Sequence, residues 1–289
     1  MALETQLELI AQQHKAAHPR AKRLRRAPRL RYPMGIEREY TRLVRSIVLP
    51  LFRDIADLVA SRAKGIAEGV ARDRETTDSI DDIGDLENLF ESINIITEQR
   101  LEKADIRNAS RRVGAGVDSH ARKQVGKTIK AVSGINPMFA TSTAAQELQL
   151  FSVTNTNLIT SMVKQQQQKL QTEILVDFQS GLRAEDISKR IQGRLKDSVT
   201  NAKARANLIA RDQVSKLNGQ LMQLRQKEIG VKSYTWRTVG DGAVRDSHAE
   251  LDGKTFSWDE PPSVGHPGDD YQCRCTAEPN LAEIFKIGE

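Results

Sequence analysis

Apolar residues recur at steps of three and four over most of the first 230 positions, a spacing that gathers them on one face of an α-helix. The clearest run starts at Val199 and continues in such steps to Leu224, before Gly230. Another run starts at Tyr40, and residues 145 to 180 are expected to form a further long helix. Steps of this kind suit helix-on-helix packing. We therefore predict a mainly helical body up to about Gly230.

Several segments are expected to interrupt these helices. Residues 71–85 are polar and acidic, which predicts a connector. A helix over 86–112 should end before Gly114 and Gly116, because glycine interrupts regular structure. A separate short helix is expected before the run that starts at Val199. The glutamine run 165–168 predicts a helix face turned to solvent rather than a low-complexity segment.

The length and composition limit the classes of protein to which the chain can belong. A chain of 289 residues predicts two domains, or one domain with long appendages. Aromatic residues make up only 4% of it, which favours helices joined by polar stretches over a β-sandwich. It has no apolar run of about 18 residues, so no membrane span is expected, and its first residues lack the pattern of a secretory signal. The two cysteines are one residue apart, which excludes a disulfide framework.

The positive charge is concentrated at the N-terminus. Residues 1–33 contain two acidic and eight basic residues, and so carry a net charge equal to the +6 of the whole chain. Basic arms of this kind bind polyanions, because each phosphate contact releases condensed counterions. Three prolines in the segment favour an extended or locally ordered arm over one continuous helix. We predict nucleic-acid binding by these basic residues, with a solvated tail as the alternative: Lys15, Arg20, Lys22, Arg23, Arg25, Arg26, Arg29 and Arg31.

After Gly230 the pattern changes to short strands and turns. Residues 231–239 alternate and are rich in β-branched and aromatic residues, which predicts a strand. A stretch rich in glycine and proline follows, and a last strand is predicted from about Tyr271. We refer to residues 231–280 as the cassette. Trp236 and Trp258 are expected to form its core, because a module of this size has few other large side chains to bury.

The cassette also contains a set of candidate metal ligands. His248, His266, Cys273 and Cys275 are donors that zinc accepts, and they lie within 28 residues. On a strand, both cysteines would face the same side. However, structural zinc sites usually have two to four residues between paired cysteines, and here there is one. Zinc binding and buried free thiols packed beneath a hairpin therefore both remain open.

Acid–base catalysis is a further alternative for the same segment. It would pair His248 or His266 with an aspartate of the cassette, namely Asp241, Asp246 or Asp252. The Asp252-Gly253 pair is first of all a turn signal. Phosphate-loop, zinc-protease and serine-hydrolase motifs do not occur in the sequence. We therefore expect no catalytic residues and no small-molecule substrate, and a nuclease or an ADP-ribosyltransferase-like enzyme is the alternative.

The order of motifs in the cassette resembles a known family. The segments Y-x-W-R-T, V-R-x-S-H, L-D-G-K-x-F and G-H-P-G-x-D-Y-x-C-R-C are similar to the C-terminal domain of Mu-F-like minor head proteins of tailed phages. The preceding helix, with Asp212 and Asn218-Gly219-Gln220, also resembles that family. The similarity covers about residues 145–280. The matching positions are Trp236, Asp241, Arg245, His248, Asp252, Gly253, His266, Cys273, Arg274 and Cys275.

This resemblance implies a head-morphogenesis protein of the virion. Its expected partners are the portal protein, the inner capsid surface and packaged double-stranded DNA, with no membrane. We predict an α+β fold with a basic, extended arm (1–35), a helical region (36–144) and a head-morphogenesis domain (145–289). The last segment would combine long helices up to about residue 230 with the β-containing cassette.

Overall fold

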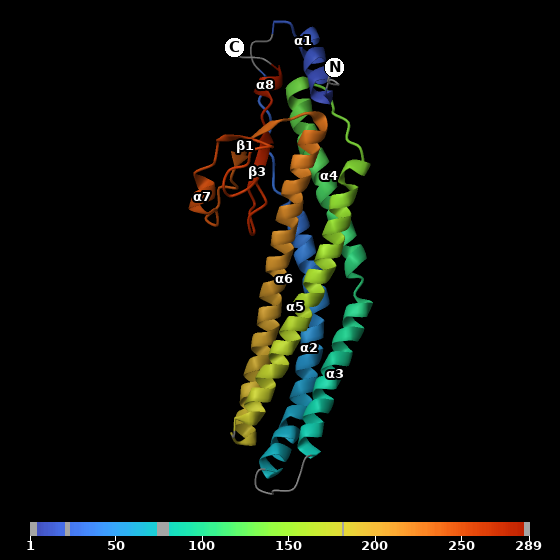
Figure 1. Cartoon of the computed structure of the whole chain (residues 1–289), viewed down its shortest axis with the longest axis vertical. Coiled ribbons are helices and arrows are strands. Elements are labelled where there is room, and N and C mark those ends of the chain that lie inside the picture. The colour runs from blue at the N-terminus through green and yellow to red at the C-terminus, as the bar shows by residue number, and fades with distance from the viewer. Residues whose placement is uncertain (1–4, 21–23, 74–80, 181, 286–289) are drawn as a thin grey trace. The chain divides into compact units, whose positions relative to one another are not determined.

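The computed structural model describes residues 5–20, 24–73, 81–180 and 182–285. Long helices account for most of it, and three strands form one antiparallel sheet near the C-terminal end (Figure 1). This confirms the predicted α+β class. The elements are α1 (Gln6–Ala17), α2 (Met34–Asp73), α3 (Asp81–Lys103), α4 (Ile106–Ser133), η1 (Ser142–Ala144), α5 (Ala145–Gln179), α6 (Ala184–Ile229), β1 (Ser233–Arg237), α7 (Asp246–Ala249), β2 (Thr255–Ser257), β3 (Thr276–Pro279) and α8 (Ala282–Phe285).

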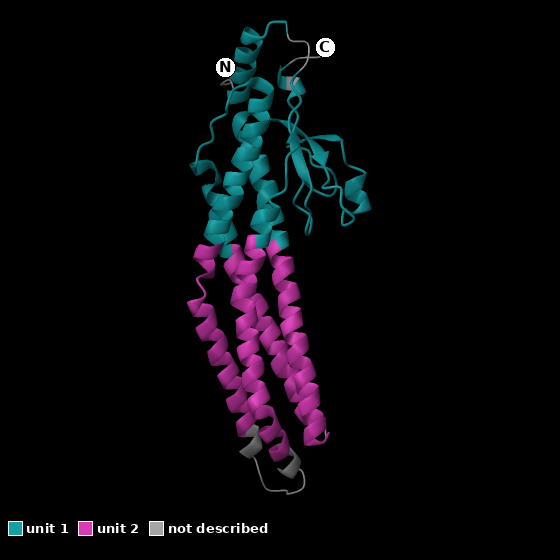
Figure 2. Ribbon diagram, turned by 180° about the vertical axis from the view of Figure 1, so that it is seen from behind, with its two compact units in different colours: residues 1–38, 110–153, 211–289 teal, residues 39–109, 154–210 magenta. Residues whose placement is uncertain are grey.

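The chain forms two compact units, each assembled from segments that are distant in the sequence (Figure 2). Unit 1 combines residues 1–38, 110–153 and 211–289, and unit 2 combines 39–109 and 154–210. The sequence analysis divided the chain into three consecutive segments, namely the arm, the helical region and the C-terminal domain. The two compact units are a different division, because each of them combines segments from several parts of the sequence. Helices α2, α4, α5 and α6 each contribute residues to both units.

Unit 2 is a bundle of helical segments with an apolar interior. The buried side chains occur at the predicted steps of three and four, as in α2, where Val44, Val48, Leu51, Phe52, Ile55 and Val59 are at most 1% exposed. One buried polar group also joins α5 to α6. The carboxylate of Asp177 is fully buried and accepts a 2.9 Å hydrogen bond from the Arg194 guanidinium. The guanidinium compensates the buried charge of Asp177, so removing either partner of the pair is expected to be strongly destabilising.

Some helix boundaries differ from the prediction. The expected helix over 86–112 is divided at Ala104 and Asp105, where the Asp105 carboxylate accepts a 3.4 Å hydrogen bond from the backbone N–H of Asn108 and begins α4. The expectation that Gly114 ends a helix is wrong, because this residue lies inside α4. A Cβ at Gly114 would lie 3.2 Å from a methyl group of Leu148, so glycine here permits close contact between α4 and α5. The short helix expected before Val199 is the beginning of α6.

The glutamine run faces solvent only in part, since Gln165 and Gln168 are exposed as predicted but the two residues between them are not. Gln166 and Gln167 are both buried in α5, at 4% and 6% exposure. The side chain of Gln167 donates a 2.5 Å hydrogen bond to the Asn94 side chain of α3. The side chain of Gln166 donates a 3.5 Å hydrogen bond to the Ser198 hydroxyl of α6. Burying an amide costs free energy unless it is hydrogen-bonded, and both of these partners belong to other helices. The connector expected over 71–85 is partly helical at both ends, and its centre, 74–80, lies outside the described residues.

In unit 1 the N-terminal arm is anchored rather than free. Residues 6–17 form α1 with a capping box between Thr5 and Glu8, so the prediction of an extended arm is wrong for this segment. Residues 24–33 have no regular secondary structure, as predicted. Leu7, Ile10, Leu30 and Tyr32 are all less than 9% exposed. These apolar residues pack the arm against the rest of unit 1, while the basic residues of the arm that the structure describes are exposed to solvent.

The sheet of the cassette has the strand order β2-β1-β3, with both pairs antiparallel. In the register, Tyr234 is opposite Phe256 and Trp236 is opposite Ala277. Trp236 and Trp258 are 0% and 2% exposed, which confirms that they form the core of the cassette. The last strand begins at Thr276 rather than near Tyr271, and Gln272 has a φ of 54°. That left-handed conformation does not fit a strand, so both cysteines precede β3.

Candidate metal centre and basic surface

One face of α6 holds the cassette in place. Asp212, Ser215, Gly219 and Gln226 follow one another at steps of three, four and seven, so they share a side of the helix. The Asp212 carboxylate accepts a 3.0 Å hydrogen bond from the backbone N–H of Gln272, and the Ser215 hydroxyl donates to the carbonyl of Cys273. The Gln226 side chain donates to the carbonyl of Ala277 at 2.7 Å. The helix thereby fixes the loop that carries both cysteines.

Gly219 and Gly268 allow the backbones of α6 and the cassette to touch. A Cβ at Gly219 would lie 2.3 Å from the carbonyl oxygen of Pro267, which is closer than any real contact. Gly268 has a φ of 103°, a conformation that residues with a Cβ avoid. Its own Cβ position would lie 2.9 Å from the carbonyl oxygen of Ser215. Two glycines are therefore required where the loop crosses the helix.

Three of the four predicted metal ligands converge in the cassette. His248 Nδ1, which α7 provides, lies 3.5 Å from Cys273 Sγ and 3.6 Å from Cys275 Sγ. The three donor atoms all lie within 4.8 Å of one another. Each of these residues is at most 5% exposed. They form a buried Cys₂His group, which we call the triad.

A carboxylate lies behind the histidine of the triad. Asp270 Oδ2 is 3.2 Å from His248 Nε2 and 3.1 Å from Arg245 Nη1. The separation from the imidazole is within ion-pair range, but Nε2 is not aligned for a hydrogen bond and has no such partner among the described residues. Nδ1 faces the two thiols, and Nε2 faces the carboxylate. The ring therefore has one nitrogen directed at sulfur and the other at an acid.

The two thiols are electrostatically different. A hydrogen bond from the Cys275 side chain lowers the pKa of Cys273 and raises the pKa of Cys275, because it stabilises a thiolate at Cys273 only. A cavity of about 20 Å³ adjoins the triad, and His248, Cys273 and Cys275 all line it. This arrangement provides two sulfur donors and one nitrogen donor beside a small space.

His266 is not part of the triad. Its Nδ1 lies 2.9 Å from the Tyr234 hydroxyl, and its ring is 5.0 Å from the Trp258 ring between centroids. Its backbone N–H donates a 2.7 Å hydrogen bond to the Asp269 carboxylate. Burial lowers the pKa of His266. The structure therefore places this histidine in the loop that crosses α6, separate from the other three predicted ligands.

The aspartates considered for acid–base chemistry have other partners. Asp241 forms an ion pair with Arg274 at 2.6 Å. Asp252 accepts a 2.8 Å hydrogen bond from the backbone N–H of Thr238 and so joins the residue after β1 to the turn after α7. Asp246 is the first residue of α7. The carboxylate beside His248 is Asp270, which the sequence did not single out.

The basic residues of the arm lie on the surface of unit 1. Two of the eight, Lys22 and Arg23, lie outside the described residues. The other six are exposed: Lys15, Arg20, Arg25, Arg26, Arg29 and Arg31. The arm contacts α4 directly, since the backbone N–H of Arg31 donates to the Gln124 side chain at 3.1 Å and its carbonyl lies 2.7 Å from His120 Nε2.

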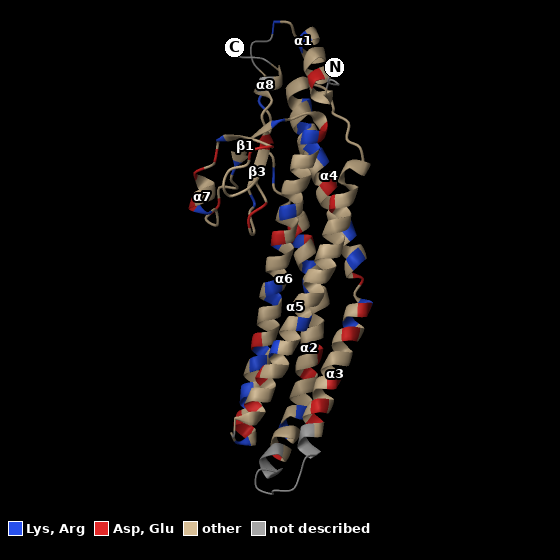
Figure 3. Cartoon of the chain, in the orientation of Figure 1, with Lys and Arg blue, Asp and Glu red and all other residues tan. Residues whose placement is uncertain are grey.

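Helix α4 is itself strongly basic, which the sequence reading missed. It contains seven basic residues and one acidic residue, whereas α3 is predominantly acidic (Figure 3). Lys123, Lys127 and Lys130 recur at steps of four and three and are exposed. In the part of the chain that the structure describes, no carboxylate forms an ion pair with them. The net charge of each predicted helix, counted from the sequence, would have revealed this concentration of positive charge.

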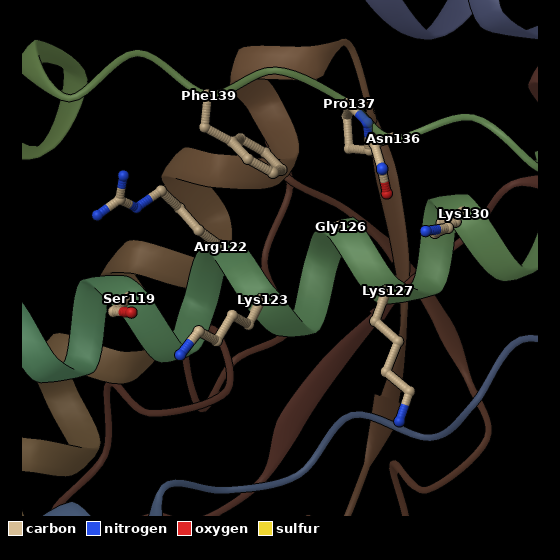
Figure 4. A pocket seen from close by; sticks show the side chains of 9 residues that line it. All are labelled: Ser119, Arg122, Lys123, Gly126, Lys127, Lys130, Asn136, Pro137 and Phe139. Atoms are coloured by element: carbon tan, nitrogen blue, oxygen red, sulfur yellow. The ribbon is translucent and has the colours of Figure 1, made fainter.

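These lysines line an open groove of about 570 Å³ on α4 (Figure 4). Asn136 and Phe139 line it from the segment that follows the helix, and Arg122 also contributes. The helical rise separates Lys123 from Lys130 by about 10 Å along the axis. None of the groove-lining residues is acidic. The groove and the exposed arm residues together make a basic surface on unit 1.

Comparison with known proteins agrees with the resemblance found in the cassette. Residues 168–278 match the family described as Phage Mu protein F like protein. The matched segment includes the last third or so of α5, all of α6 and most of the cassette, so it contains both the triad and the helix face that holds it. The match confirms the predicted family resemblance for this C-terminal part.

A relative in Haemophilus influenzae (strain ATCC 51907 / DSM 11121 / KW20 / Rd), described as "Uncharacterized protein", is 31% identical over 191 residues. The alignment covers 63% of this chain and 42% of the relative, so the chain spans less than half of that protein. No solved structure matches the chain. Within the described residues, no helix is long and apolar enough to cross a membrane.

Proposed function

Because residues 168–278 match the Phage Mu protein F like family, we propose that the chain is a minor head protein of a tailed phage that acts in head morphogenesis. The family match is the observation that carries this proposal. The architecture supports it, since α6 and the cassette form one connected structure through Asp212, Ser215 and Gln226. The role is one of assembly, without turnover of a small molecule.

The proposed protein partners are the portal and the inner surface of the capsid. The test is to assemble heads of the phage that encodes this chain with and without the portal gene. Quantitative immunoblots of purified heads would then measure this chain against the major capsid protein. We expect the chain in heads with a portal and its loss from heads without one. Equal amounts in both kinds of head would contradict the portal contact.

The proposed nucleic-acid partner is packaged double-stranded DNA. The exposed basic residues of the arm and the lysines of α4 support this proposal. Within the described residues these cations have no ion-pair partners, and the arm contacts α4 directly. Clustered cations gain affinity for DNA through counterion release, independent of base sequence. The contact is therefore proposed to be non-specific and sensitive to salt. Its physical contribution is to hold DNA near the head protein.

A further inference from the structure

The separations within the triad match those of ligands around one zinc ion. Tetrahedral Zn²⁺ with Zn–S near 2.3 Å and Zn–N near 2.05 Å places sulfur and nitrogen donors about 3.5 Å apart. The two nitrogen–sulfur distances here are 3.5 and 3.6 Å. Free thiols that pack as small apolar groups would not require an imidazole nitrogen at this distance from both sulfur atoms. The triad thus has the geometry that a shared ion requires.

Two further observations point to the same ligand. Histidines that bind a metal commonly direct their other ring nitrogen at a carboxylate, which orients the ring; Asp270 lies 3.2 Å from Nε2 of His248. In addition, the adjoining cavity of about 20 Å³ exceeds the 10–15 Å³ or so that one water requires. The triad therefore has a carboxylate within ion-pair range on one side and room for one small ligand on the other.

We propose that His248 Nδ1, Cys273 Sγ and Cys275 Sγ bind one Zn²⁺, with water as the fourth ligand in the adjoining cavity. Soft thiolates and a neutral imidazole select zinc over magnesium or calcium, which prefer oxygen. Both thiols lose their protons to solvent on binding. Asp241 also lines the cavity, but its carboxylate is paired with Arg274 and is not needed as a ligand. This proposal does not depend on a role in the phage head.

The ion would have a structural role in the cassette. It would join α7, which carries His248, to the loop before β3, which carries both cysteines. In that loop Gln272, directly before Cys273, has a left-handed backbone conformation. A metal bound only in the folded state stabilises the folded state. Zinc is therefore expected to stabilise this part of unit 1.

The test uses the full chain purified under reducing conditions from cells grown with zinc. Elemental analysis should give about one zinc per chain. After exchange into Co²⁺, the visible spectrum should show tetrahedral ligand-field bands and thiolate-to-cobalt charge transfer. A folded, reduced chain that retains no zinc and gives a featureless cobalt spectrum would overturn the proposal. Measurements on the unaltered chain do not depend on whether a variant folds.

Single substitutions then test which residues bind the ion. His248→Gln and Cys273→Ser should each lower zinc content and remove or weaken the cobalt bands. His266→Gln is the matched control, because this histidine also lies in the cassette but outside the triad. It should retain about one zinc per chain. Zinc loss in His266→Gln equal to that in His248→Gln would overturn the choice of ligands.

Discussion

At the scale of single residues, Gly219 is where the cassette and α6 come closest. A Cβ there would lie 2.3 Å from the Pro267 carbonyl and 3.1 Å from the Cα of Gly268, so Gly219→Ala must displace the loop. We expect a loss of about 1–3 kcal/mol in the free energy of unfolding, as for other overpacked sites. Urea denaturation would measure it. Hydrogen exchange should locate the added opening in residues 265–273.

The matched control lies in the same helix. Gly193 has no atom within 4 Å of its Cβ position. Gly193→Ala should therefore leave stability unchanged or raise it by up to about 1 kcal/mol, because alanine is the better helix former. If both alanine variants unfold at the same urea concentration, the close approach at Gly219 is not what constrains that position.

His266 gives the cassette a predictable pH dependence. Burial lowers its pKa in the folded state below the ordinary value of about 6.5. Between the folded-state and unfolded-state pKa values of His266, the unfolded chain binds more protons than the folded chain. The contribution of His266 to stability is therefore complete above about pH 6.5 and is lost as the pH falls. His266→Gln should therefore show a weaker loss of stability between pH 7 and pH 5 than the unaltered chain. Parallel stability curves for the two proteins would contradict this expectation.

At the scale of elements, a buried ion pair joins α4 to α6. Arg225 is fully buried and donates to the Asp118 carboxylate at 2.7 and 3.0 Å. Asp118→Ala would leave the guanidinium with less compensation in the interior, and we expect a loss of about 3–5 kcal/mol on denaturant unfolding. Lys64→Ala provides the contrast, because its pair with Glu68 is largely exposed and such pairs contribute below about 1 kcal/mol. Similar losses for the two variants would contradict the account.

The helices were predictable because their apolar spacing is a local property. The start of α5 and the end of α6 agree with the sequence within a residue. The division between α3 and α4 was missed, since Asp105 acts there through a single capping bond. The burial of Gln167 depends on Asn94, which is 73 residues away. Contacts of that kind leave no local pattern in the sequence.

The sequence identified the candidate metal ligands but could not show which of them lie close together. His248, Cys273 and Cys275 were named from their chemistry, and the structure brings them together. His266 was named on the same grounds and lies elsewhere, because hydrogen bonds to Tyr234 and Asp269 fix it. The two cysteines reach one side through a turn at Gln272, not through a strand. Only tertiary structure reveals that turn or the position of Asp270.

At the scale of the whole molecule, the basic surface of unit 1 should determine how DNA binding responds to salt. Replacing Lys123, Lys127 and Lys130 by glutamine removes three exposed cations from the groove. If all three contact phosphates, the slope of log K against log salt becomes shallower by about 2.7. Fluorescence anisotropy with a duplex of arbitrary sequence, at several salt concentrations, would measure the slope. Substitution is preferable to deleting residues 1–33, because Leu7, Leu30 and other arm residues are part of the core.

A control with the same change in net charge separates a local surface from a general effect. Lys64, Lys169 and Lys189 are exposed and lie 3.7 to 3.9 Å from carboxylates on their own helices in unit 2. Replacing all three by glutamine should leave the slope nearly unchanged. Equal reductions in the two triple variants would mean that DNA senses only the total charge.

The most direct test of the proposed role is mass spectrometry of purified virions and of empty heads from the phage that encodes this chain. Peptides from both units would be quantified against the portal and major capsid proteins. We expect the chain to be present in purified heads, in far fewer copies than the major capsid protein. Its absence from both virions and empty heads would contradict the assignment as a minor head protein.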